Sequence, residues 1–172
     1  MQTEDTEYAS LLARNLLCYV SGKSQEEILA DREKYACESV CDAMEQVVQR
    51  IVDGEPLAYI LGEWEFYGMR LLVDKNVLIP RDDTCAVAAL AIKKALYLDQ
   101  DPRILDLCTG SGCIGLAIAS RVKDAKITLG DISREALAVA KRNISLHKMT
   151  GRVSGVQVDA RSAPSPFLGN LT

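Results

Sequence analysis

Glycines at positions 110, 112 and 115 form a G-x-G-x-x-G pattern between an apolar run, 103–107, and an amphipathic run, 112–122. This spacing is typical of a turn that joins a strand to a helix. Glycines there let backbone N–H groups approach a ligand closely, and the start of the helix adds the positive end of its dipole. We therefore expect the turn around Gly110 and Gly112 to bind a ligand.

Two carboxylates indicate which ligand binds. Asp131 closes the next predicted strand, 21 residues after Gly110, where a carboxylate can accept hydrogen bonds from both ribose hydroxyls of an adenosine group. Asp106 lies in the strand before the turn, at a position that is apolar in nicotinamide-binding turns because an unpaired buried charge is costly. An acid there suits the ammonium group of S-adenosylmethionine, whose carboxylate suits the helix start. The methyl donor is therefore favoured over NAD, and a turn that binds nothing is the third interpretation.

Asp159 and Ala160 follow the third predicted strand, 152–158. Asp159 could accept a hydrogen bond from the adenine amine or be an exposed loop residue, and the sequence leaves both open. We expect no metal site, because the six cysteines form no C-x-x-C pair and His147 is the only histidine. His147 is expected at a helix C-terminus, solvated and favourable to the dipole.

The composition indicates a globular protein that binds neither nucleic acid nor membranes. Its 172 residues are 48% hydrophobic, and 20 Lys and Arg against 24 Asp and Glu give a net charge of -4. A nucleic-acid-binding face would need a basic excess, and no run approaches the ~18 apolar residues of a membrane span. The polar, acidic N-terminus is unlike a secretory signal, so we expect a cytoplasmic protein.

The elements that position these residues divide into three predicted regions. They are a helical domain at 1–61, a β-hairpin linker at 62–81 and an α/β domain at 82–172. In the last region, after a predicted helix at 83–98, short apolar runs alternate with amphipathic helices, which predicts parallel βαβ units.

Two details of the first regions are also predicted. Ser24 and the glutamate three residues later form a capping box. The helix that follows has an apolar stripe formed by Val40, Met44, Val47, Val48 and Ile51, and Cys37 and Cys41 beside it are interpreted as core cysteines. In the linker, residues 74–76 separate two apolar runs and suggest the loop of the hairpin.

Three separated stretches together resemble the peptide chain release factor N(5)-glutamine methyltransferases, the HemK or PrmC family. They are G-E-P-L-A-Y-I-L-G at 54–62 followed by Glu65 and Phe66, V-L-I-P-R-D-D-T at 77–84, and L-D-L-C-T-G-S-G at 105–112 followed by Asp131. Their order and approximate spacing are those of the family, over residues 8–159. The first two stretches are far more specific than the glycine turn.

The resemblance implies an α/β fold with a small N-terminal helical domain, a β-hairpin linker and a class I, Rossmann-like methyltransferase domain. It implies S-adenosylmethionine-dependent methylation of the glutamine amide in the Gly-Gly-Gln loop of a translation release factor, which the helical domain helps to hold. The cofactor loop of the family maps onto Cys108, Thr109, Gly110, Ser111 and Gly112, and its ribose-binding acid onto Asp131. A segment that lies over the cofactor maps onto 78–85, which places Arg81 and Thr84, with Asp106, near the cofactor.

The sequence departs from the family pattern at several positions. Cys108 replaces the first glycine of the loop, Asp82 replaces a proline and Cys85 replaces a glutamate. The five prolines are all separated, so the catalytic N-P-P-Y motif is absent. We therefore expect an inactive N-terminal part of the enzyme, and no catalytic residue is assigned.

Three alternative functions stay open. An adenine-specific DNA methyltransferase has a similar N-P-P-Y motif, but the net charge disfavours DNA binding. A nicotinamide oxidoreductase is disfavoured by Asp106, and a non-catalytic binding fragment is the third alternative.

In the class I strand order 3-2-1-4, strand 103–107 is central, and without the fourth strand its apolar residues lie at an open edge. Such an edge favours self-association.

Overall fold

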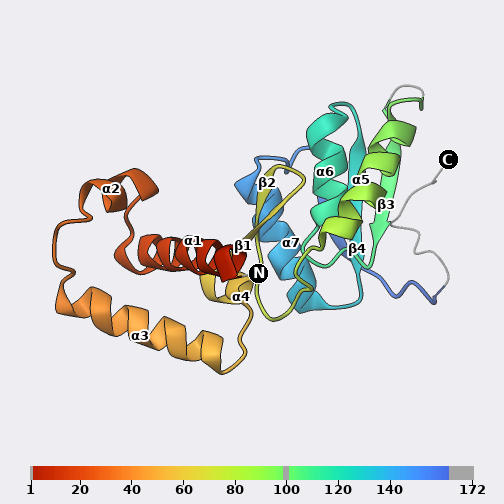
Figure 1. Ribbon diagram of the computed structural model, residues 1–172. Coiled ribbons are helices and arrows are strands. Elements are labelled where there is room, and N and C mark those ends of the chain that lie inside the picture. The colour runs from red at the N-terminus through yellow and green to blue at the C-terminus, as the bar shows by residue number, and fades with distance from the viewer. Residues whose placement is uncertain (1, 99–100, 163–172) are drawn as a thin grey trace. The chain divides into compact units, whose positions relative to one another are not determined.

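The computed structural model describes residues 2–98 and 101–162 (Figure 1). The chain divides into two compact units, Met1–Leu61 and Gly62–Thr172. No helix among the described residues is long and apolar enough to cross a membrane.

The first unit consists of helices. They are α1 (Gln2–Ser21), α2 (Gln25–Ala30), α3 (Glu38–Val52) and α4 (Leu57–Leu61). Leu16, Val47 and Ile60 form its buried centre, one from each of the three helices α1, α3 and α4. The predicted capping box is confirmed, because the Ser24 hydroxyl accepts the Glu27 amide and the Glu27 carboxylate accepts the Ser24 amide.

The apolar stripe of α3 is narrower than predicted. Met44, Val47 and Ile51 contribute to the core cluster of this unit, but Val48 is 44% exposed. The interpretation of Cys37 and Cys41 as core cysteines is wrong, since both are exposed. Cys37 is the N-cap residue of α3 and precedes the helical stripe, and Cys41 lies about a quarter turn away from it at roughly 100° per residue.

A β-hairpin opens the second unit. Strands β1 (Glu63–Phe66) and β2 (Met69–Leu72) pair antiparallel. The turn between them is Tyr67 and Gly68, with φ of 53° and 73°, because two left-handed residues match the twist of a two-residue hairpin. The prediction of a hairpin loop at residues 74–76 is wrong. There the Asp74 carboxylate accepts the Asn76 amide at 3.0 Å and forms a local turn after β2.

The rest of the second unit is an α/β layer. Its strands β3 (Arg103–Leu107), β4 (Lys126–Asp131) and β5 (Val153–Gln157) are parallel, in the order β3-β4-β5. Its helices are α5 (Asp82–Ala95), α6 (Cys113–Arg121) and α7 (Arg134–Leu146). This arrangement confirms the predicted fold class and the βαβ alternation.

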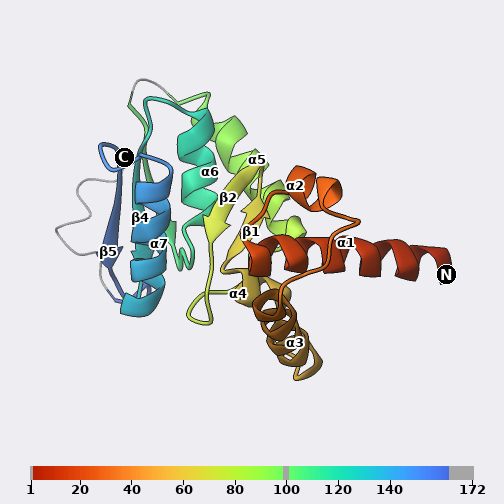
Figure 2. The same ribbon diagram turned by 90° about the vertical axis from the view of Figure 1, so that its left-hand side faces the viewer.

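Helices α6 and α7 lie against one face of this sheet (Figures 1 and 2). Gly115 lets α6 approach β4 closely, because a Cβ atom there would lie 2.3 Å from a Leu129 methyl group. Leu105 and Leu107 lie on the other face, beside Gly130, and Leu107 is 43% exposed. Among the described strands β3 pairs with β4 alone, so it is an edge strand there, and self-association through this edge stays a prediction.

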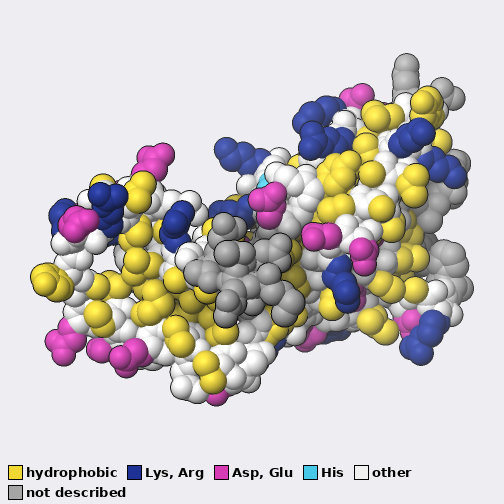
Figure 3. Space-filling view, in the orientation of Figure 1, with side chains coloured by type: hydrophobic (Ala, Val, Ile, Leu, Met, Phe, Trp, Pro, Cys, Tyr) yellow, Lys and Arg dark blue, Asp and Glu magenta, His cyan; other side chains and the backbone are white. Residues whose placement is uncertain are grey.

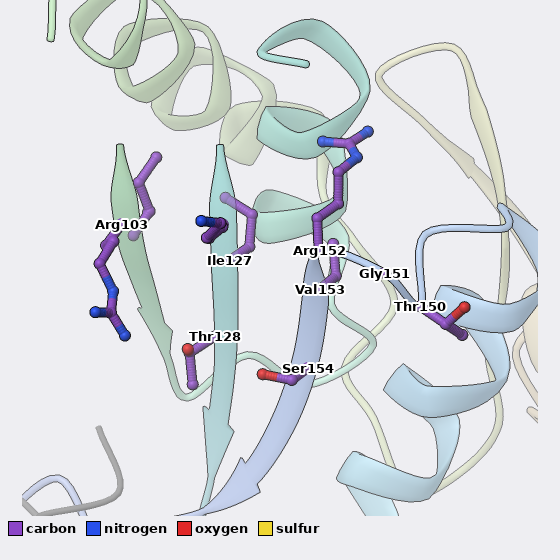
Figure 4. Close-up of a pocket in the computed structure, with 10 residues that line it drawn as sticks. Arg103, Ile127, Thr128, Thr150, Gly151, Arg152, Val153 and Ser154 are labelled. Atoms are coloured by element: carbon purple, nitrogen blue, oxygen red, sulfur yellow. The ribbon is translucent and has the colours of Figure 1, made fainter. Parts of the chain in front are cut away.

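A hollow of about 230 Å³ lies at the N-terminal ends of the three strands (Figure 4). Arg103, Thr128, Arg152 and Ser154 are among the residues that line it. The Arg152 guanidinium donates to the carbonyl oxygens of Ala119 and Val122 at the end of α6, so this cation stabilises the helix terminus. The glycine turn lies at the opposite, C-terminal ends of the strands.

Candidate functional site

The turn between β3 and α6 is built from left-handed residues. Cys108, Gly110 and Gly112 have φ of 58°, 55° and 86°. The Thr109 amide donates to the Gly130 carbonyl at 3.1 Å, and the Gly112 amide donates to the Thr109 carbonyl at 2.9 Å. Glycine adopts this backbone without steric cost, which explains the glycine pattern.

Asp106 holds both ends of the turn. One oxygen of its carboxylate, Oδ2, accepts the Thr109 hydroxyl at 2.7 Å and the Gly115 amide at 3.0 Å. Burial raises the pKa of Asp106, and these two hydrogen bonds lower it only in part. The buried charge thus joins the end of β3 to the first turn of α6.

Asp131 holds the middle of the turn from the end of β4. Its Oδ2 accepts the Gly110 amide at 2.9 Å and its Oδ1 accepts the Ser133 amide at 3.0 Å. Each carboxylate oxygen can accept about two hydrogen bonds, so both oxygens retain capacity for a ligand. The structure therefore brings Asp131 against the glycine turn.

Ser111 is a buried hydroxyl within the turn. It is 2% exposed, and its Oγ makes no hydrogen bond of good geometry within the described part of the chain. Burial raises the pKa of the nearby Cys113 thiol to about 11, although the interaction of the thiol with the Ser111 side chain lowers this pKa in part. Cys113 is therefore a neutral thiol at pH 7 and a poor nucleophile.

Asn143 of α7 links the turn to the β-hairpin. Its side chain is fully buried, and its amide group donates to the carbonyl oxygens of Ser111 and Leu72, both at 2.9 Å. Its oxygen accepts the Leu72 amide at 2.7 Å. The sequence does not reveal this role of Asn143, because a single asparagine in an amphipathic helix gives no signal of such contacts.

Two further contacts join α7 to the segment around the hairpin. The His147 ring donates through Nε2 to the Arg70 carbonyl at 2.7 Å, so the predicted C-terminal position is confirmed but the ring is bonded to β2. The Arg142 guanidinium lies 2.6 Å from an Asp74 carboxylate oxygen.

The other predicted residues lie outside this network of hydrogen bonds. Asp159 forms an ion pair with Arg161 at 3.1 Å, which lowers the pKa of the carboxylate, and Ala160 is exposed. Arg81 is the N-cap residue of α5, and its carbonyl accepts the Thr84 amide at 3.0 Å. Cys108 lies in the turn with its side chain exposed. In the described ranges, His, Cys, Asp and Glu side chains form no group of three that could hold a metal ion.

Comparisons with known proteins give the family. The model of the PrmC N-terminal domain matches residues 2–62, and that of the methyltransferase small domain matches residues 83–167. The chain carries the PrmC N-terminal domain followed by a methyltransferase domain. This confirms the predicted family, and the methyltransferase domain agrees with the predicted S-adenosylmethionine cofactor.

Several curated relatives are similar to this chain. The release factor glutamine methyltransferase of Chlorobaculum tepidum is 38% identical over 89% of the chain and 53% of its own length. That of Vibrio cholerae is 37% identical over 83% and 49%. The ribosomal protein uL3 glutamine methyltransferase of Francisella tularensis is 41% identical over 67% and 37%. The chain thus spans about half of these relatives, or less.

A solved structure also resembles part of the chain. It is P. horikoshii TYW2 in complex with MeSAdo, with a TM-score of 0.49 and 20% sequence identity. The likeness covers 59% of the present chain and 37% of the TYW2 chain.

The raised pKa of Asp106 predicts a pH dependence of stability. A carboxyl whose pKa is higher in the folded state stabilises the fold at low pH, and this contribution is lost as the pH rises from 3.8 through the folded pKa. Asp106→Asn removes this titration and retains an oxygen for the Gly115 amide. We expect the variant to gain stability relative to the native chain as the pH rises through this window, measured by urea unfolding.

Asp74→Asn is the matched control of opposite sign. Burial raises the pKa of Asp74, but hydrogen bonds from Asn76 and Arg142 lower it further, so its folded pKa is below 3.8. This variant should therefore lose stability relative to the native chain as the pH rises. If the free energy of unfolding changed with pH in the same way for the native chain and for Asp106→Asn, the prediction for Asp106 would be contradicted.

Removal of the Asn143 amide should loosen the turn and the hairpin together. Asn143→Ala leaves the Ser111 carbonyl and both backbone groups of Leu72 without their partner, at a cost of about 2–3 kcal/mol. Val139→Ala, at another buried position of α7, is the control for lost packing. Hydrogen exchange should accelerate locally at Leu72 and Gly110 in Asn143→Ala only. The same exchange pattern in both variants would contradict this link.

Proposed function

We propose that the intact protein transfers a methyl group from S-adenosylmethionine to the glutamine side-chain amide in the Gly-Gly-Gln loop of a translation release factor. Relatives that match 89% and 83% of the chain are named release factor glutamine methyltransferases. A relative that matches a smaller part is named for ribosomal protein uL3. All these names contain the word glutamine, so a glutamine side chain as the methylated group is better supported than the identity of the substrate protein.

The single observation that carries the proposal is the fit of the turn to the methyl donor. Asp131 is fixed beside Gly110 and keeps acceptor capacity on both oxygens. A Cβ atom at Gly110 would meet no atom within 4 Å, so open space adjoins the turn. The Ser111 hydroxyl is buried and makes no hydrogen bond of good geometry among the described residues, so it could bond to a bound ligand.

Each of these residues would contact a different part of the ligand. Asp131 would accept the ribose hydroxyls, and the turn from Thr109 to Gly112 would lie along the adenosine and the carboxylate end. The Oδ1 atom of Asp106, to which no described group donates, would accept the ammonium group. When bound, the cofactor supplies a methyl group on positively charged sulfur, and the residues named here orient it and exclude water from it.

The other parts of the proposal follow the family resemblance. The N-terminal helical unit would help to hold the release factor, and Arg81 and Thr84 would lie close to the cofactor. Asp159 and Ala160 would lie near the adenine, which requires the ion pair between Asp159 and Arg161 to open or to turn aside. A cytoplasmic location and the absence of direct nucleic-acid binding complete the proposal.

Asp131→Ala should weaken S-adenosylmethionine binding by about 1–3 kcal/mol, because the ribose hydroxyls lose their acceptor. Isothermal titration calorimetry of the native chain and the variant measures this change. Asp131→Asn retains one oxygen for the Gly110 amide and separates loss of ligand contact from loosening of the turn. Glu135→Gln, an exposed acid at the start of α7, is the control. Equal affinity in the native chain and Asp131→Ala would remove Asp131 from the site.

The 172 residues alone should bind the donor without transferring its methyl group. The five prolines are separated, so the N-P-P-Y motif that holds the target amide in the family is absent from these residues. A release factor incubated with the chain and S-adenosylmethionine should show no mass increase at the glutamine. A methylated glutamine would show that residues within the chain suffice for catalysis.

A further inference from the structure

The outward face of α5 carries apolar side chains that the described chain does not cover. Val87 is 53% exposed and Leu90 is 68% exposed, whereas Ala88, Ile92 and Ala95 on the opposite face are buried. Figure 3 shows hydrophobic side chains gathered over this helix on the visible face of the second unit. Clusters of large exposed apolar side chains commonly mark interaction surfaces.

Charged residues continue this apolar stripe at both ends of the helix. Asp83, Val87, Leu90 and Lys94 follow one another at intervals of four, three and four residues, which places them on one face of a helix. In the described ranges, neither Asp83 nor Lys94 forms an ion pair. The helix dipole explains an acid at the start and a base at the end, but it does not require them to share the apolar face.

The stripe is complementary to itself. Asp83 and Lys94 lie equally far from the midpoint of the helix, and so do Val87 and Leu90. When two copies of α5 pack antiparallel, each Asp83 faces a Lys94 and each Val87 faces a Leu90, whereas a parallel pair would oppose like charges. We propose that α5 is a two-fold symmetric interface with a second copy of this chain.

Residues beyond the helix extend the same interface. Tyr97 and Leu98, just after α5, are 81% and 53% exposed. A hollow of about 500 Å³ before the start of α5 is lined by residues that include Trp64, Leu78 and Pro80. Antiparallel packing brings the segment that follows one α5 towards the segment that precedes the other. Tyr97 of each copy would therefore lie near this hollow of its partner.

The size of the surface sets the strength of the pair. One helix of 14 residues with a short flanking segment falls below the roughly 800 Å² per partner of a standard stable interface. The dimer is therefore weak and depends on concentration.

Analytical ultracentrifugation of the full chain over a range of concentrations tests the interface. Asp83→Lys and Lys94→Asp each place like charges opposite one another twice in the symmetric dimer, and each should weaken dimerisation about tenfold. An equimolar mixture of the two variants should recover the dimer, because both contacts then join opposite charges. This recovery requires folded protein and so excludes misfolding as the cause of the loss.

Lys93→Asp and Asp124→Lys are the matched controls. They change the net charge equally, but Lys93 lies about a quarter turn away from the stripe and Asp124 is an exposed residue outside α5, so both variants should retain the native dimerisation constant. A native chain that stays monomeric at every concentration would overturn the proposal. A dimer that neither Asp83→Lys nor Lys94→Asp weakens would overturn it too and would indicate another surface, such as the edge of β3. A mixture that fails to recover would exclude antiparallel pairing.

Discussion

The second unit depends on satisfying the backbone polar groups of one irregular turn. Residues 108–112 belong neither to the sheet nor to a helix, so much of their hydrogen bonding comes from side chains. Asp106 bonds to Thr109 and to the first turn of α6, Asp131 accepts the Gly110 amide, and Asn143 donates to the Ser111 carbonyl. An unpaired buried backbone group costs about as much as a lost hydrogen bond, so these three residues fix where α6 begins.

The same three side chains join elements that are distant in the sequence. Asp131 brings the end of β4 to the turn, and Asn143 brings α7 and the hairpin residue Leu72 to it. Close packing of α6 on β4 requires Gly115, because a side chain there would overlap Leu129. The glycine pattern therefore serves two constraints at once, a left-handed backbone in the turn and a short distance between helix and sheet.

The sequence predicted the βαβ part of this unit well, because alternation of short apolar runs with amphipathic runs is a local signal. Asp106 and Asp131 were also found, since a charge beside an apolar strand stands out. The hairpin register was missed because its turn uses Tyr67 and not a residue that prefers positive φ. Asn143 was missed because its partners, Leu72 and Ser111, lie 71 and 32 residues away, and only the folded chain brings them together.

Cys108 stands where the family pattern has glycine, and its main effect is backbone strain and not steric overlap. Its φ of 58° lies in the left-handed region, which costs a residue other than glycine about 1–2 kcal/mol. Its side chain is exposed, so it displaces no neighbour in the core. Hydrogen bonds to Thr109 and Gly110 on its C-terminal side hold the turn in shape and offset this cost. The strained backbone at Cys108 and the buried Ser111 hydroxyl, which makes no hydrogen bond of good geometry among the described residues, both support the proposal that this turn is shaped to hold a ligand.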